Sequence, residues 1–310
     1  MSVQSLIWVL IASMGAVDYI LFAAQGMTVT IRWASVFGSI FLYGLSVVYR
    51  RRAPPVARAA TSAAQIVAFS NVGAILTYAA MAASPFPMAD ALLSHADSAI
   101  GFDWIAWFNL VNDNPKLHFV LALAYASAPA QGIGLIAYFS RAEPKRVDEF
   151  LLAGILSIIL IVPIMVLLPA VGAWSQHGVG LVEPWRGDIL ALRSHALPTV
   201  DEMQGIISFP SFHTVLGVLF ANMARGRKWF LPMLVLNLTL LASVMSEGAH
   251  YGVDMLGGLA VAWVAVVASR SILRCCAHND VMMILTQLVG SKKGLVVHTA
   301  RSEIFLADRR

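Results

Sequence analysis

Two short segments of the chain carry side chains suited to nucleophilic and acid–base chemistry. The first is Ser208-Phe-Pro-Ser-Phe-His213-Thr, and the second is Gly248-Ala-His250-Tyr-Gly-Val-Asp254. His250 and Asp254 are four residues apart, so in a helix they lie on one face and can hydrogen-bond. A carboxylate bonded to one imidazole nitrogen fixes the tautomer and leaves the other nitrogen free. The pair therefore predicts that His250 acts as a nucleophile or base.

The segment around His213 has the features of a helix start. Pro210 and Ser211 are residue types typical of the first helical position and of the N-cap. A helix N-terminus presents unpaired backbone N–H groups and a partial positive charge, both of which favour an anion such as phosphate. We therefore expect Ser211 and His213 to lie beside such an anion.

A zinc site is the competing interpretation, because two histidines and an aspartate could hold that ion. The chain has no His-Glu-x-x-His motif and no cysteine near these residues. A phosphate site would give Arg193 and Ser211 a role, whereas a metal site would leave the arginine without one. The sequence thus favours phosphate chemistry without a metal or other cofactor.

The elements that position these residues are expected to be transmembrane helices. Of the 310 residues, 59% are hydrophobic and only 12% are charged, and the mean hydropathy is +0.75. Soluble domains carry about a quarter charged residues, so the composition excludes an ordinary soluble protein. Apolar runs of roughly 20 residues indicate transmembrane helices, and the chain predicts an all-α bundle of about eight spans: 5–24, 30–49, 62–84, 117–139, 149–172, 209–225, 229–247 and 252–274.

Loop charges predict the orientation of this bundle. The connection after the second span holds Arg50, Arg51 and Arg52, whereas the loop 85–116 holds four aspartates against Lys116 alone. Positive loops stay in the cytoplasm. Both termini are therefore expected in the cytoplasm, and the two histidine segments at the extracytoplasmic face of a bacterial inner membrane. The net charge of +4 is interpreted as this orientation signal and not as a nucleic-acid surface.

Three regions are predicted. Residues 1–60 form two additional N-terminal helices, 61–275 form a six-helix catalytic core with external loop helices, and 276–310 form a cytoplasmic tail. The external stretch 90–108 has apolar residues at helical spacing and predicts an amphipathic helix on the outer surface, with Trp104 and Trp107 at the membrane interface.

Some residues outside the two segments have structural interpretations. Asp18 and Arg32 could pair within the N-terminal spans. Gly257 and Gly258 are expected to allow close helix packing.

Together the motifs resemble a known family. Phe-Pro-Ser-Phe-His-Thr, followed by Gly-Ala-His-Tyr-Gly-Val-Asp-Met-Leu-Gly-Gly, resembles the type 2 phosphatidic acid phosphatase superfamily. The chain is most similar to the branch that contains fungal inositol phosphorylceramide synthases and many bacterial membrane proteins, and Asp188-Ile-Leu-Ala-Leu-Arg193 is also similar to that branch. The resemblance covers the six spans from about 62 to 275.

The resemblance implies a role for each site residue. His250 would attack phosphorus to form a phosphohistidine, and Asp254 would orient it. His213 would protonate the departing oxygen and then activate the acceptor, while Ser211 and nearby backbone amides would hold phosphate oxygens. Such phosphoryl transfer needs no metal, because positioning and fixed positive charge stabilise the transition state.

The chain departs from the wider family in its cations. The Lys-x6-Arg-Pro segment is absent, Phe212 replaces a glycine, and Val244 stands where an arginine is usual. The phosphate charge is therefore assigned to Arg193, with Arg186 and Lys116 as further candidates.

The predicted function is phosphoryl transfer on a lipid phosphate, the expected partners being that lipid and the membrane. With water as acceptor the protein is a lipid phosphatase, which is the favoured interpretation; with an alcohol it is a phospholipid head-group transferase. The remaining alternative is a non-enzymatic transporter or assembly partner with a degenerate site. The sequence does not predict the oligomeric state.

Overall fold

A computed structural model describes residues 2–277 of the chain. The predicted cytoplasmic tail lies outside the described residues from position 278 onward. The apolar helices, in chain order, are α1 (Val3–Ala24), α2 (Trp33–Tyr49), α3 (Pro54–Ala83), α6 (Pro115–Ala126), α7 (Ala128–Ala142), α8 (Pro144–Leu167), α11 (Phe212–Ala224), α12 (Phe230–Glu247) and Gly252–Ala277, which we call the last helix. The shorter elements are α4 (Asp90–Ala99), α5 (Trp104–Asn112), α9 (Ala173–His177), α10 (Arg186–Arg193) and the strands β1 (Thr28–Val29) and β2 (Thr199–Val200).

The described chain is an all-α polytopic bundle, as predicted. Five helices are long and apolar enough to cross a membrane, and α6 with α7 makes a sixth if the bent pair is one span. The two remaining predicted spans correspond to shorter apolar helices, α2 with 17 residues and α11 with 13. A straight crossing takes about 20 residues, so α11 extends over only part of a bilayer. The protein is therefore an integral membrane protein.

The bounds of several predicted spans differ from the structure: the span 62–84 begins at Pro54 in α3, and the span 149–172 ends at Leu167 in α8. The span 117–139 is divided into α6 and α7, which meet at an angle of 45°. Pro129 lies in the first turn of α7, and a proline has no N–H to donate to the preceding turn, so the helix breaks there. The span 209–225 begins at Phe212, because Ser211 caps the helix.

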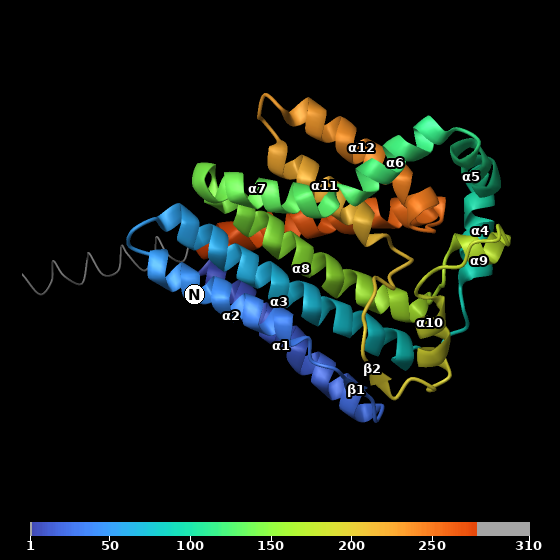
Figure 1. Ribbon diagram of the computed structural model, residues 1–310, viewed down its shortest axis with the longest axis horizontal. Helices are drawn as coiled ribbons and strands as arrows, with labels where there is room; N and C mark the ends of the chain where they lie inside the picture. The colour runs from blue at the N-terminus through green and yellow to red at the C-terminus, as the bar shows by residue number, and fades with distance from the viewer. Residues whose placement is uncertain (1, 278–310) are drawn as a thin grey trace, which may run out of the picture.

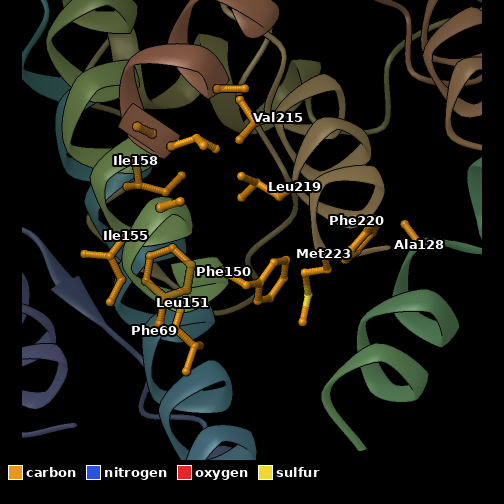
Figure 2. Packing of buried hydrophobic residues seen from close by; sticks show 14 of the residues in the cluster. Phe69, Ala128, Phe150, Leu151, Ile155, Ile158, Val215, Leu219, Phe220 and Met223 are labelled. Carbon is orange, nitrogen blue, oxygen red and sulfur yellow. The ribbon is translucent and has the colours of Figure 1, made fainter. Parts of the chain in front are cut away.

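α8 lies at the centre of the packed core. Figure 2 shows Phe150 and Ile158 of α8 in one cluster with Phe69 of α3 and Leu219 of α11. The Phe150 ring stacks on Phe220 of α11 with the centroids 5.7 Å apart. Between helices in lipid, van der Waals packing supplies much of the attraction. This packing fixes α11, which carries His213 near its first turn.

An ion-pair cluster joins the helix ends far from His213. Glu149, near the start of α8, accepts hydrogen bonds from Arg225 after α11, from Arg270 of the last helix and from Asn222. The carboxylate is buried, and two guanidinium partners offset the cost of removing its charge from water. The cluster holds α8, α11 and the last helix together at this end of the bundle.

The short helices gather at the opposite end of the molecule (Figure 1). There β1, in the connection between α1 and α2, pairs in parallel with β2, with Thr28 beside Thr199. The pairing ties the N-terminal helices to the segment that leads into α11.

Three structural expectations are wrong. The stretch 90–108 is not one amphipathic helix: α4 ends at Ala99, and Gly101 takes a positive φ of 78° before α5 begins. Trp104 is not an interface anchor, because only 1% of its surface is exposed. Asp18 and Arg32 do not pair: among the described residues both Asp18 carboxylate oxygens lack a hydrogen-bond partner, and Arg32 donates to the carbonyl of Met203.

Candidate active site

His250 and Asp254 form the expected dyad. Nδ1 of His250 lies 3.0 Å from Oδ2 of Asp254, and both side chains are buried. Oδ2 also accepts the backbone N–H of Tyr251 at 2.9 Å. A carboxylate can only accept, so the proton of a neutral His250 ring is on Nδ1. The Nε2 lone pair is then left available to attack an electrophile.

Ser211 connects the two catalytic segments. Its Oγ lies 3.4 Å from Nε2 of His250, and the same oxygen accepts the backbone N–H of Thr214 as the N-cap of α11. Its backbone N–H donates to the carbonyl of Asp254 at 3.1 Å. Because α11 begins at Phe212, the N–H groups of its first residues have no acceptor within the helix. These donors are therefore grouped beside the nucleophilic nitrogen.

His213 faces the dyad from α11. The rings of His213 and His250 are arranged edge to face with their centroids 6.2 Å apart. Tyr125 of α6 stacks on the other side of His213 at 4.7 Å, which fixes the plane of the imidazole. His213 is half-buried, whereas His250 is buried.

Two glycines of the last helix allow α11 to approach closely. A Cβ on Gly258 would lie 2.6 Å from the carbonyl oxygen of Ser211 and 2.8 Å from Cβ of Thr214. A Cβ on Gly257 would lie 3.0 Å from Pro210. The expected packing role of this pair is confirmed, and it brings the Ser211 turn against the helix that carries Asp254.

α4 and α5 hold the first turn of the last helix. Both carboxylate oxygens of Asp97, in α4, accept backbone N–H groups, from Gly252 at 2.9 Å and from Val253 at 2.8 Å. Burial raises the pKa of Asp97 above its ordinary value, and these two hydrogen bonds oppose that shift. The indole N–H of Trp104 donates to the carbonyl of His250 at 2.9 Å.

A second contact network holds Tyr251, next to the nucleophile. Its hydroxyl donates to Asp90 of α4 at 2.9 Å, and burial raises its pKa. Asp90 in turn accepts the backbone N–H groups of Val171 and Gly172. The loop after α8 is thereby joined to the catalytic segment.

Arg193 is held away from this hydrogen-bond network. Its guanidinium donates to the backbone carbonyls of Ser84 and Phe86, in the connection between α3 and α4. No hydrogen bond or ion pair of the described residues joins it to Ser211, His213 or His250. Its assignment to phosphate binding stays a prediction.

Comparison with known proteins places the chain in a family. Residues 91–268, from α4 into the last helix, match the family model of the PAP2 superfamily. The chain belongs to the PAP2 superfamily. No curated protein and no solved structure matches the chain. Members of the superfamily are phosphatases or phosphotransferases, so membership suggests phosphoryl transfer on a lipid phosphate.

Within this PAP2 chain, sequence reasoning missed the residues that hold the catalytic segment in place. Asp90 and Asp97 counted only as loop charges, and Trp104 as an interface residue. Their contacts with residues 250–253 cross more than a hundred sequence positions, so periodicity carries no signal for them. Among residues 2–277 no three His, Cys, Asp or Glu side chains converge in an arrangement that could hold a metal ion.

Proposed function

We propose that this PAP2 protein is a lipid phosphate phosphatase that acts through a phosphohistidine on His250, without a metal. The observation that carries the proposal is the Asp254–His250–Ser211 alignment. The 3.0 Å contact holds Nδ1 protonated and turns Nε2 toward Ser211 and the start of α11. A phosphoryl group bound there would be within reach of both histidines.

The first step transfers the phosphoryl group to the enzyme. Nε2 of His250 forms a bond to phosphorus while the bond from phosphorus to the lipid oxygen breaks. His213, as imidazolium, gives its proton to that oxygen, so the lipid leaves as an alcohol. Asp254 stabilises the charge that develops on the His250 ring. Ser211 and the free N–H groups of α11 hold the non-bridging oxygens.

The second step frees the enzyme. The now neutral His213 takes a proton from water, whose oxygen forms a bond to phosphorus as the nitrogen–phosphorus bond breaks. Inorganic phosphate departs, and both histidines return to their starting protonation states. An alcohol in place of water would make the same site a head-group transferase, as the resemblance to the inositol phosphorylceramide synthase branch suggests.

The site is proposed to face the extracytoplasmic side. The arginines of the α2–α3 connection lie at one end of the bundle in Figure 1, and α4 with its aspartates lies at the other, near the catalytic segments. With positive loops in the cytoplasm, the substrate is a lipid of the outer leaflet that enters from the bilayer.

The experiment is phosphate release from phosphatidic acid, phosphatidylglycerol phosphate, sphingoid-base phosphates and polyprenyl phosphates in the presence of a chelator. We expect release by the wild type and a loss of about 10³-fold or more in His250→Ala. His95→Ala, which changes an exposed histidine of α4, should keep full activity.

A second measurement separates the enzymatic alternatives. Brief reaction with a lipid radiolabelled in its phosphate, followed by trapping of the acid-labile phosphohistidine, should place the label on the wild type and not on His250→Ala. Label without phosphate release would indicate that the acceptor is an alcohol and not water. The absence of both label and phosphate release would contradict an enzymatic function. The histidine segments would then be the degenerate site of a non-enzymatic protein.

A further inference from the structure

A groove lies between the N-terminal helices and α3, separate from the catalytic histidines. It has a volume of 610 Å³ and is lined by α1, α2 and α3 together with β1 and Met203. Ligand sites have volumes of about 300–1,000 Å³, so the groove is large enough for a lipid chain. Its walls are almost entirely apolar, with side chains such as Trp8, Ile40 and Val72.

Arg32 is the one charged residue that lines this groove. It stands at the start of α2 and is exposed, and its hydrogen bond to the carbonyl of Met203 is long, at 3.4 Å. No carboxylate among residues 2–277 forms an ion pair with it. A guanidinium has five N–H donors, so most of the donors of Arg32 remain available. Within the described chain, Arg32 is therefore a cation without a carboxylate partner at the mouth of an apolar slot.

A second cavity continues from the first toward the segment that precedes α11. It has a volume of 360 Å³ and shares Arg32, Ser35, Asn71 and Met203 with the groove. Its far wall is formed by residues 204–207 and Phe212. Neither cavity is lined by His213, His250 or Ser211. A phosphate bound at Arg32 would therefore be outside the reacting centre.

We propose that this groove binds one anionic phospholipid of the surrounding bilayer as an accessory lipid. Its phosphate is held by Arg32, and an acyl chain lies along the apolar slot between α1, α2 and α3. Charge complementarity decides the occupant: a cation at the mouth of an apolar slot matches an anionic head group on an acyl chain, and guanidinium–phosphate pairs form strong paired hydrogen bonds. A zwitterionic lipid would add a positive charge beside Arg32.

The bound lipid would also contact the segment that carries the catalytic motif. Met203 lines both cavities, and Phe212 lines the second, directly beside His213 in sequence. β1, which contributes Val29 to the groove, pairs with β2 a few residues upstream. The proposal does not depend on the proposed reaction, because it concerns binding at a different place.

The test is native mass spectrometry of the His250→Ala chain with phosphatidylglycerol or phosphatidylcholine of the same acyl chains. The His250→Ala background prevents turnover, so the result is independent of the proposed phosphatase. We expect one phosphatidylglycerol retained per chain, with a preference over phosphatidylcholine of about tenfold, the size expected for one charge-assisted contact.

Three variants locate this binding, and two further variants serve as controls. Arg32→Gln should remove the head-group preference, and Arg32→Lys should restore most of it. Ser39→Phe, which fills the slot from α2, should reduce retention of both lipids. The matched controls are Arg141→Gln, at an exposed arginine in the last turn of α7, and Thr239→Phe, in an apolar groove between α6 and α12 whose lining has no charged residue. Both controls should bind as the parent does.

Three results would overturn the proposal: equal retention of the two lipids by the parent chain, an unchanged preference in Arg32→Gln, or equal losses in Ser39→Phe and Thr239→Phe. Thermal unfolding of each variant in detergent, where no lipid is present, shows whether it has kept the fold. If Ser39→Phe does not fold, the Arg32→Gln and Arg32→Lys pair decides alone.

Discussion

At the scale of single residues, the site depends on which nitrogen of each imidazole has a hydrogen-bond partner. His250 has Nδ1 committed to Asp254, and Tyr251 donates a backbone N–H to the same carboxylate oxygen. The aspartate is therefore oriented by the backbone before it orients the histidine. His213 is fixed by stacking on Tyr125 and keeps its nitrogens for proton transfer. This difference is why we propose His250 for attack on phosphorus and His213 for acid–base work.

Replacing Asp254 tests this division. Asp254→Asn keeps the shape of the side chain but removes the charge that stabilises a cationic His250 ring and fixes its tautomer. We expect kcat for phosphate release to fall by about 10²- to 10⁴-fold with a smaller change in KM. Asp201→Asn is the matched control, because its carboxylate contacts Thr30 and neither histidine. Equal losses in the two variants would contradict a specific role for Asp254.

His177 predicts how stability depends on pH. Its ring stacks on Trp104 with the centroids 4.9 Å apart, and Tyr251 lies on another side at 6.4 Å. Burial lowers the pKa of His177 below the ordinary 6.5, although Asp97 and Asp103 oppose this shift. Because the folded-state pKa is depressed, its stabilising contribution is present above about pH 6.5 and is lost as the pH falls through the folded-state pKa.

The measurement compares thermal unfolding of the wild type and His177→Phe from about pH 7.5 to about pH 5. The variant keeps an aromatic ring against Trp104 but cannot titrate. We expect the wild type to lose more melting temperature on acidification than the variant. Parallel curves would contradict the assignment.

At the scale of elements, α4 and α5 position the segment that carries His250. α4 supplies Asp97 to the first turn of the last helix and Asp90 to Tyr251. α5 supplies the indole of Trp104 to the carbonyl of His250. A carboxylate at a helix N-terminus also interacts favourably with the helix dipole. The segment that carries His250 is therefore held both by the helices of the bundle and by α4 and α5.

Asp97→Asn tests whether α4 positions the nucleophile. The asparagine side chain has one oxygen in place of two, so it can accept only one of the two N–H groups well. The negative charge is also lost, so the remaining hydrogen bond is weaker. We expect kcat to fall by about tenfold, corresponding to about 1.4 kcal/mol, with KM little changed. Asp103→Asn, which alters only the cap of α5 through Ala106, should leave kcat near the wild-type value. The reverse order of the two effects would contradict the positioning role.

Gly258→Ala tests the contact between the last helix and α11. The new Cβ would lie 2.6 Å from the carbonyl oxygen of Ser211, so the two helices would have to separate. We expect a loss of about 1–3 kcal/mol in unfolding free energy together with reduced phosphate release.

Gly134→Ala in α7 is the control for the glycine contact, because nothing lies within 4 Å of its Cβ position. It should be neutral or stabilising by up to about 1 kcal/mol, since alanine favours a helix over glycine. Similar losses in both variants would show that helix approach at Gly258 is not special.

At the scale of the whole molecule, polar clusters stand at both ends of an apolar bundle. Glu149 and its arginines close one end, and the site with its external helices occupies the other. The distribution of loop charge predicts that the Glu149 end is cytoplasmic. In the proposed orientation the substrate would approach from the outer leaflet.

Cysteine labelling of intact cells with a membrane-impermeant maleimide tests this orientation. His95→Cys, in a chain with Cys275→Ser and Cys276→Ser, should react without permeabilisation, because His95 is exposed on α4. The exposed Cys275 of the wild-type chain should react only after permeabilisation. The opposite result would place the site in the cytoplasm.

Local patterns of the sequence determined the helical class, the membrane location and the dyad. Apolar runs report burial in lipid whatever the helices pack against. The spacing of His250 and Asp254 places them on one helical face without reference to the rest of the chain. Ser211 was recognisable as a cap for the same reason, because a cap is a contact over three residues. These features depend on neighbours along the chain.

Tertiary structure alone decided the surroundings of the dyad. Asp97 and Trp104 reach the catalytic segment across about half of the chain, and Arg193 donates to α3–α4 carbonyls instead of joining the site's hydrogen bonds. The groove at Arg32 likewise depends on how helices pack in space. Helical periodicity identifies a buried face but not the element that covers it, so the partners of these residues follow only from the folded chain.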